Sequence, residues 1–231
     1  MWFAGPVRRV PESGRPRALR LGFQLAPGMR VGLFGGSFDP AHDGHAHVAE
    51  TARQRLRLDR VIWLVSPQNP LKRGRQPAPL AARMASARRH ARGPAMIVSD
   101  AESRIGSVYT LDTVRVLKAR FPRVRFVWVM GADNLASFQR WRGWADILRS
   151  LPVAVVARPG ALARSGFTPM ARRFARARVP SRQASRLPYA TPPAWCYLNA
   201  RLNPASSTAL RAGRAAGAEP NAVPVVEPRA R

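Results

Sequence analysis

The sequence predicts an α/β protein of one domain, built on a doubly wound parallel sheet. From Arg30 onward, short apolar runs rich in β-branched residues alternate with stretches of helical periodicity, which is the pattern of βαβ units. Hydrophobic residues make up 46% of the chain, enough for a packed core, so wholly disordered and fibrous proteins are excluded. A length of 231 residues is typical of one domain with extensions.

The alternation predicts six strands and the helices that join them. The predicted strands are Arg30–Phe34, Arg60–Ser66, Ala95–Ser99, Val124–Met130, Pro152–Ala157 and Trp195–Leu198. The predicted helices are His45–Arg57, Leu80–Arg92, Val108–Ala119, Asp133–Phe138 and Trp144–Ser150, with a last helix beginning near Ser207. Since helices separate successive strands, the sheet should be parallel and covered on both faces.

Three segments lie outside this alternation, which assigns residues 30–214 to the domain itself. Residues 1–29 form an Arg-rich, Pro-containing leader without a secretory signal, and we expect it to be loose. Residues 161–193 carry seven arginines and no acid; we expect a solvated insertion rather than a binding arm, with a basic amphipathic helix possible at its start. Residues 215–231 lack periodicity and predict a frayed tail.

The composition narrows the class of protein but does not choose its function. The formal net charge of +27 would attract nucleic acids, phosphorylated metabolites or membrane surfaces alike. All basic residues except Lys72 and Lys118 are arginines, which genome base composition explains as well as phosphate binding does. No apolar run approaches the roughly 20 residues of a membrane span. The single cysteine, Cys196, asks for no oxidising compartment, so we expect a buried inert thiol and a cytoplasmic location.

The segment VGLFGGSFDPAHDGHAHVAE, residues 31–50, carries the strongest signal. It places Gly35, Gly36 and Ser37 after a predicted strand and shortly before a predicted helix. Two glycines allow backbone N–H groups to approach an anion, and the helix N-terminus adds its positive dipole end. The segment therefore predicts a phosphate site, although it has neither a P-loop lysine nor GxGxxG spacing.

Two histidines in this segment are candidates for contact with that phosphate. His42 and His45 are three residues apart and can face one pocket, whereas His47 is expected on the helix face. A zinc set of His42, His45, His47 and Glu50 is the alternative, but these intervals do not converge on one helix face.

The string GGSFDPAHDGH resembles the HxGH signature of the class I nucleotidyltransferase superfamily, and most resembles that of bacterial nicotinate-nucleotide adenylyltransferases. The resemblance covers about residues 30–214, because further matching segments follow in order. It implies a Rossmann-like nucleotidyltransferase fold and transfer of the adenylyl group of ATP to nicotinate mononucleotide. The products would be deamido-NAD and pyrophosphate, in a step of NAD biosynthesis.

The resemblance also implies residues that bind the acceptor. VSPQNPLK, residues 65–72, resembles the segment that contacts the mononucleotide and places Asn69 and Lys72 there. YTLDT, residues 109–113, resembles the segment that puts Tyr109 and Thr110 beside the pyridine ring. In the segment VWVMGADNLASFQRW, Trp141 corresponds to the tryptophan that stacks on nicotinate.

The same resemblance implies the ATP site. ATP contacts are expected from Gly35, Gly36, Ser37, Phe38, Gly131, Asp133, Arg158, Ser206, Ser207 and Thr208, and catalytic roles from His42, His45, Lys72 and Arg211. The acceptor phosphate is already anionic near neutral pH, so no general base is needed. Catalysis should come from alignment and charge stabilisation. Mg²⁺ is expected to be carried mainly by the ATP phosphates, because the motif offers few carboxylates.

Other functions remain open at this point. An acceptor such as nicotinamide mononucleotide or phosphopantetheine, or cytidylyl transfer, would use the same HxGH core. A class I aminoacyl-tRNA synthetase is disfavoured by the length and by the missing lysine-rich second signature. A basic RNA-binding protein with a vestigial nucleotide fold is permitted by the charge, but residues 161–193 interleave few aromatics with their arginines. Nucleic acid is therefore not the expected partner, and the sequence does not indicate an oligomeric state.

Overall fold

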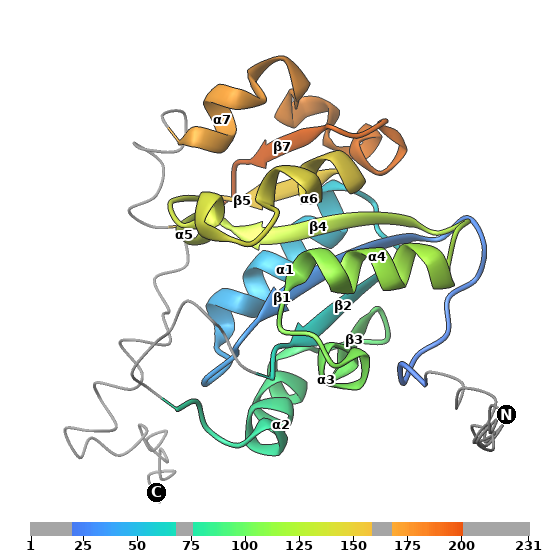
Figure 1. Cartoon of the computed structure of the whole chain (residues 1–231), viewed down its shortest axis with the longest axis vertical. Helices are drawn as coiled ribbons and strands as arrows, with labels where there is room; N and C mark the ends of the chain where they lie inside the picture. Colours follow the sequence, from blue (N-terminus) through green and yellow to red (C-terminus); the bar gives the residue numbers. More distant parts are fainter. Residues whose placement is uncertain (1–19, 68–75, 159–167, 201–231) are drawn as a thin grey trace, which may run out of the picture.

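The computed structural model describes residues 20–67, 76–158 and 168–200. These residues form one sheet of seven strands in the order β3-β2-β1-β4-β5-β7-β6, with every pair parallel and helices on both faces (Figure 1). The strands are β1 Arg30–Gly36, β2 Arg60–Val65, β3 Met96–Ser99, β4 Arg125–Gly131, β5 Val153–Val156, β6 Arg178–Val179 and β7 Trp195–Leu198. The predicted doubly wound α/β class is confirmed.

The helices alternate with the strands as expected, and several short elements are additional. They are α1 Asp43–Arg55, α2 Leu80–His90, α3 Ala101–Ile105, α4 Thr110–Arg120, α5 Ala132–Leu135, α6 Trp144–Ser150, α7 Pro169–Arg173 and the 3-10 segments η1 Phe138–Arg140, η3 Ala175–Ala177 and η4 Ser181–Tyr189. The prediction missed α3 and β6, which are too short to show a hydrophobic period, and also the 3-10 segments η3 and η4. The predicted helix at Asp133–Phe138 is instead the short α5 followed by η1.

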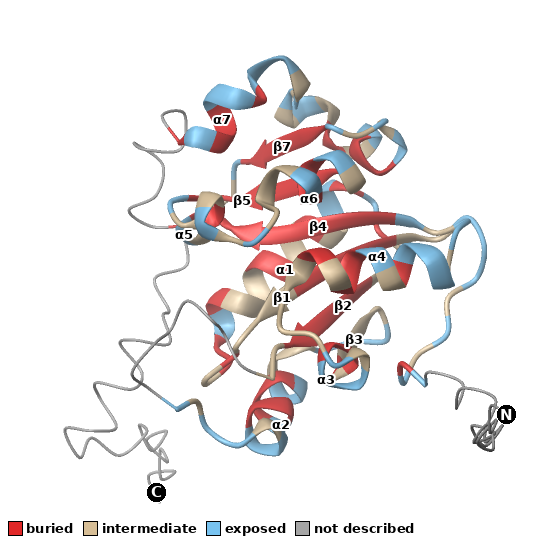
Figure 2. Cartoon of the chain, in the orientation of Figure 1, coloured by how far each residue is buried: buried red, intermediate tan, exposed pale blue. Residues whose placement is uncertain are grey.

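Two apolar cores lie on the two faces of the sheet. In β2, Ile62 and Leu64 point into the core that α4 and α6 cover, while Val61, Trp63 and Val65 point into the core that α1 and α2 cover. Figure 2 shows the central strands as a continuous buried layer between partly exposed helices. Because both faces are covered, the strands read as continuous apolar runs. Trp63 and Trp128 are buried core residues, as predicted.

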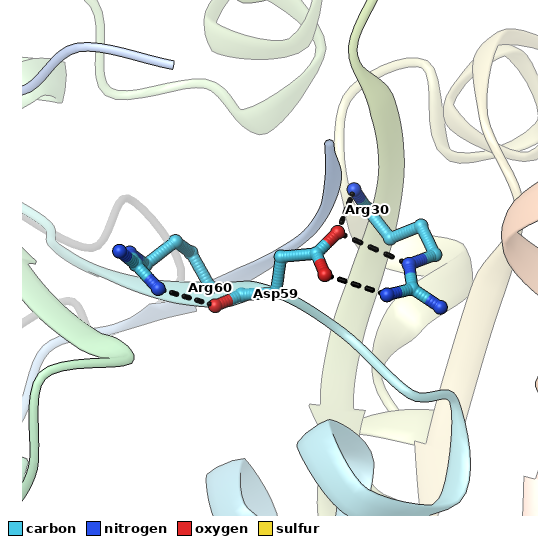
Figure 3. A network of polar contacts seen from close by, with 3 residues as sticks. All are labelled: Arg30, Asp59 and Arg60. Atoms are coloured by element: carbon cyan, nitrogen blue, oxygen red, sulfur yellow. Dashed lines mark hydrogen bonds and ion pairs between the residues drawn. The ribbon is translucent and has the colours of Figure 1, made fainter. Parts of the chain in front are cut away.

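An ion pair joins the starts of β1 and β2, at the edge of the sheet opposite the strand carboxyl ends. Arg30 donates from Nε and Nη2 to the Asp59 carboxylate at 3.0 and 2.5 Å, and its backbone N–H donates to the same group at 2.8 Å (Figure 3). The guanidinium lowers the pKa of Asp59. Since both side chains remain partly exposed, the pair contributes little to the free energy of unfolding.

The expectation of a solvated insertion is wrong for the described part of residues 161–193. Residues 168–193 contain α7, η3, β6 and η4, and Met170 and Leu187 are fully buried. The Trp195 indole donates to the Phe174 carbonyl at 2.8 Å, tying this segment to β7. Its apolar residues recur between the arginines, and a count of charges overlooks that pattern.

The packed part of the chain also begins earlier than predicted. Leu21 is buried in the core, and its carbonyl accepts from the Ser99 hydroxyl at 3.0 Å. Gly28 N–H donates to the Arg123 carbonyl at 2.7 Å. Residues 20–29 are therefore packed on the sheet rather than loose.

Candidate active site

The predicted phosphate site lies at the carboxyl edge of the sheet. β1 pairs with β2 on one side and with β4 on the other, so the direction of winding changes at β1. In open α/β sheets such a switch point leaves a crevice outside the strand carboxyl ends, where ligands bind. Gly36 ends β1 and Gly131 ends β4 at this edge.

Gly35 and Gly36 belong to β1, which corrects the prediction that they follow the strand. They pair with Leu64 and Val65 of β2, because the parallel ladder continues to the end of the glycine pair. A Cβ on Gly35 would lie 2.5 Å from the ring of Trp128, and a Cβ on Gly36 would lie 2.9 Å from the ring of Phe38. Aromatic packing therefore requires both glycines, in addition to any approach of an anion.

Phe38 turns the chain from β1 towards α1. Its φ of 46° is in the left-handed region, which a bulky residue adopts only where packing holds it. The ring is 1% exposed and lies edge-on to Phe34 and close to Trp63 and His45. Phe38 was predicted to contact ATP; its side chain is instead in the core, so only its backbone remains for such a contact.

His42 and His45 face each other at the start of α1. Their ring centroids are 3.8 Å apart, and the backbone N–H of His42 donates to Nδ1 of His45 at 3.2 Å. Because Nδ1 of His45 accepts, a neutral His45 carries its proton on Nε2, which makes Nε2 a donor. The two predicted catalytic imidazoles are thus brought together.

His42 is neutral at physiological pH. It is 3% exposed, and burial, followed by the positive charges of Arg158 and His90, lowers its pKa to about 4, while Asp43 acts in the opposite direction. A neutral imidazole acts at a phosphate as a hydrogen-bond donor rather than as a cation. Positive charge at this edge therefore has to come from arginine or lysine.

The predicted ATP residues beyond β1 gather beside His42. Gly131 ends β4, and a Cβ there would lie 3.3 Å from Cγ of Arg158. The Arg158 Nε is 3.9 Å from the Asp133 carboxylate, and Arg158 is close enough to His42 to lower its pKa. Arg158, Asp133 and the histidine pair therefore lie together at this edge.

The predicted acceptor residues Tyr109 and Thr110 lie at the start of α4. Tyr109 precedes the helix, Thr110 is its first residue, and Leu111 is in the core as expected. The Ser107 hydroxyl accepts from Tyr109 N–H at 3.1 Å and donates to Asp112 at 3.0 Å. These bonds fix the backbone at the start of the helix.

Trp141 lies in a turn packed against the start of α4. A Cβ on Gly143 would lie 2.5 Å from Leu111 of that helix, and the Arg142 guanidinium stacks 4.6 Å above the Tyr109 ring. Half-buried Trp141 meets the Trp128 ring edge-on at 6.0 Å, and Trp128 also fills the space over Gly35. The Trp128 ring therefore contacts both Gly35 of β1 and Trp141, one of the residues predicted to bind the acceptor.

The remaining predicted residues, Asn69, Lys72, Ser206, Ser207, Thr208 and Arg211, lie outside the described residues and stay predictions.

Two buried ionisable residues escaped the prediction. Arg83 of α2 is 2% exposed and donates to four backbone carbonyls, those of Ala78, Ser37, Ser66 and Pro67. Glu102 of α3 is 4% exposed and hydrogen-bonds the Ser66 side chain. No motif marks either residue: Arg83 is one arginine among many in a helical stretch, and α3 itself was missed.

The burial of Glu102 can be tested through the pH dependence of the free energy of unfolding. Burial raises its pKa from 4.5 to about 7, and the Ser66 hydrogen bond opposes that rise. Its contribution to stability is therefore complete below pH 4.5 and is lost as the pH rises through 7. Relative to the wild type, Glu102→Gln should gain free energy of unfolding between pH 5 and 7.5, by at most about 3 kcal/mol, in urea denaturation.

The pH dependence of wild-type stability does not isolate the effect of Glu102, because His42 changes the free energy of unfolding with pH in the opposite direction. Its contribution is complete above pH 6.5 and is lost as the pH falls towards 4. Both proteins contain His42, so subtracting the wild-type free energy of unfolding from that of Glu102→Gln at each pH removes the contribution of His42. Parallel stability profiles for the two proteins would contradict the buried, protonated carboxyl.

The alternative of a metal site finds no ligand set in the structure: the described residues contain no group of three or more His, Cys, Asp or Glu side chains able to hold a metal ion. His47 instead lines a cavity of about 370 Å³ with Asp43, His90 and Trp63.

Cys196 is buried as predicted, which raises the pKa of its thiol to about 11. Of the helices in the described ranges, none has the length and apolarity to cross a membrane.

This combination of fold and site defines a nucleotidyltransferase: the family model described as "Cytidylyltransferase-like" matches residues 33–213. A relative from Caulobacter sp. (strain K31) named "Probable nicotinate-nucleotide adenylyltransferase" is 65% identical over 189 residues, which are 82% of this chain and 100% of the relative. A relative of the same name from Rhizobium meliloti (strain 1021) is 49% identical, over 80% of this chain and 99% of its own. The chain belongs to the nicotinate-nucleotide adenylyltransferase family, as its resemblance implied.

A solved structure shows the same fold. The nicotinic acid mononucleotide adenylyltransferase of Plasmodium falciparum, solved in complexes with APC and with NaAD, superposes with a TM-score of 0.59. It covers 80% of this chain and 83% of its own, at 13% sequence identity.

Proposed function

We propose that this enzyme transfers the adenylyl group of ATP to nicotinate mononucleotide, producing deamido-NAD and pyrophosphate in NAD biosynthesis. Membership of the family supports the reaction. The observation that carries it here is the facing pair His42 and His45, held where β1 meets α1 beside Arg158. We propose residues 30–214 as the catalytic domain, on whose core residues 20–29 pack, with residues 215–231 as a tail outside it.

In this proposal the protein stabilises charge and aligns two anions. The acceptor phosphate attacks the α-phosphorus of ATP in line with the departing pyrophosphate, and being anionic already it needs no general base. Nε2 of His45 donates to the oxygens that gain charge, and neutral His42 donates beside it. Arg158, with Lys72 and Arg211, offsets the remaining negative charge.

We propose that Mg²⁺ enters with the ATP phosphates. The metal would neutralise phosphate charge and orient the triphosphate. Asp133 is the carboxylate that the structure places beside Arg158 at this edge, so the protein supplies few ligands of its own. A cytoplasmic location fits a reaction between soluble nucleotides, and the proposal needs no nucleic-acid partner.

A panel of acceptors tests this function. Purified enzyme with ATP and Mg²⁺ should release pyrophosphate with nicotinate mononucleotide, and much less with nicotinamide mononucleotide or phosphopantetheine. Liquid chromatography should identify deamido-NAD as the product. Faster turnover with phosphopantetheine, or with CTP in place of ATP, would assign the chain to a different transferase.

Arg142 gives a prediction about the choice of acceptor. Its guanidinium lies over Tyr109 next to Trp141, where the acceptor ring is proposed to bind. Since an arginine favours a ring that carries a carboxylate, Arg142→Gln should lower kcat/KM for nicotinate mononucleotide about tenfold and leave the nicotinamide form almost unchanged. Arg125→Gln, which removes a similar stack 4.7 Å over Tyr189, is the control. An unchanged ratio between the two acceptors would contradict this role.

A further inference from the structure

Arg83 is a buried cation whose bonds all go to backbone carbonyls. Nε donates to Ala78 O at 2.7 Å, Nη1 to Ser37 O at 2.9 Å and to Ser66 O at 2.6 Å, and Nη2 to Pro67 O at 3.0 Å. Burying a guanidinium is costly unless its donors are satisfied, so this arrangement is not an incidental surface contact.

Three of the four carbonyls that Arg83 holds come from two segments far from it and from each other in sequence. Ser37 follows the last residue of β1, and Ser66 and Pro67 follow the last residue of β2. One nitrogen, Nη1, bridges Ser37 and Ser66, next to the backbone bond from Ser66 N–H to Gly36 O at 3.0 Å. The exits of both strands are thus joined where the sheet ladder ends.

Ser66 is held from the other face of the sheet as well. Glu102 lies on α3, which packs with α4 against one core, whereas Arg83 lies on α2, which packs against the other. The Ser66 side chain hydrogen-bonds the buried Glu102 carboxyl, while its backbone carbonyl accepts from Arg83. Two buried ionisable side chains therefore fix one residue at the carboxyl edge.

We propose that Arg83 and Glu102 are positioning residues, which hold the exits of β1 and β2 in one fixed arrangement so that the loop from Ser37 to His42 is presented to the triphosphate in its reactive geometry. This inference rests on the proposed function. Neither residue is proposed to touch a substrate. Arg83 acts through the Ser37 and Ser66 carbonyls, and Glu102 acts through the Ser66 hydroxyl.

The main test compares Arg83→Met with Met84→Ala. Met84 is the neighbouring buried residue of α2, and its truncation removes packing without affecting the four carbonyls. At equal fractions folded, Arg83→Met should lower kcat about a hundredfold, the scale of a small misplacement of reacting groups, whereas Met84→Ala should stay within about threefold. Equal kcat in the two variants would overturn the proposal.

Arg83→Lys is the variant to be measured in place of Arg83→Met if Arg83→Met does not fold. The lysine keeps the charge but cannot reproduce the planar fork, so kcat should lie between those of the wild type and Arg83→Met, about tenfold below the wild type. A wild-type kcat in Arg83→Lys would overturn the requirement for the fork.

Glu102 is tested by a pair of its own. Glu102→Gln keeps an acceptor for the Ser66 hydroxyl and should retain wild-type kcat, whereas Glu102→Leu leaves that hydroxyl without the bond and should lose about tenfold. Equal kcat in the two Glu102 variants would remove Glu102 from the proposal.

ATP affinity separates this inference from the proposed function. If the wild type fails to turn over nicotinate mononucleotide, the proposed function fails, but calorimetry with ATP still reports on the loop. Arg83→Met should then raise the Kd for ATP about tenfold over the wild type, with Met84→Ala unchanged. Equal affinities in all three proteins would overturn the positioning role.

Discussion

We expect His45→Ala to lower kcat by at least about a hundredfold while its fold stays intact, because the substitution removes a donor already oriented towards the transition-state charge. The orientation comes from the bond between His42 N–H and Nδ1 of His45, and from packing of the His45 ring on Phe38 at 5.0 Å. KM for ATP should change less than kcat, since the interaction strengthens mainly in the transition state. Pyrophosphate release under saturating substrates measures the effect.

His47→Ala is the matched control for this experiment. His47 lies two residues further along α1, in the cavity lined by Asp43 and His90, and has no proposed role in the reaction. Its kcat should stay near the wild-type value. Near-normal turnover in folded His45→Ala would contradict the assignment of His45.

The largest expected effect on stability is that of Trp128→Ala, at about 3–5 kcal/mol of unfolding free energy. Trp128 is 1% exposed, lies over Gly35 of β1 and contacts Trp141. Its truncation therefore opens a cavity between these two residues. Urea denaturation followed by circular dichroism measures the loss.

Trp128→Phe separates volume from aromatic contact. Phenylalanine keeps most of the ring area, and the indole N–H that it removes has no hydrogen-bond partner among the described residues. We expect a loss of about 1 kcal/mol for Trp128→Phe. A similarly small loss for Trp128→Ala would contradict the central place of this ring.

The fold could be predicted because its signals are local and repeated. The predicted strand Val124–Met130 is buried on both faces from Phe126 onward and so contains an unbroken apolar run after Arg125, and it corresponds to β4 within a residue at either end. The arginine-rich segment was mispredicted because its packing is visible only in three dimensions. Arg178, for example, is exposed to solvent and at the same time stacks 5.2 Å over Trp195, so a charged residue covers an apolar ring.

The candidate site could be predicted in part for a similar reason. The histidines lie within one contiguous motif, whose spacing brings them together at a helix start. Arg83 and Glu102 belong to no motif, because each acts on backbone carbonyls or on a hydroxyl supplied by distant segments. Phe38 belongs to the motif, but its side chain lies in the core, so its predicted ATP contact stays a prediction for the backbone alone.

The most direct test of the proposed role of His45 is a crystal structure with nicotinate mononucleotide and a non-hydrolysable ATP analogue bound together. We expect the α-phosphate within hydrogen-bond distance of Nε2 of His45 and the acceptor phosphate opposite the departing pyrophosphate. A nucleotide bound elsewhere, with both imidazoles covered by protein atoms, would contradict it.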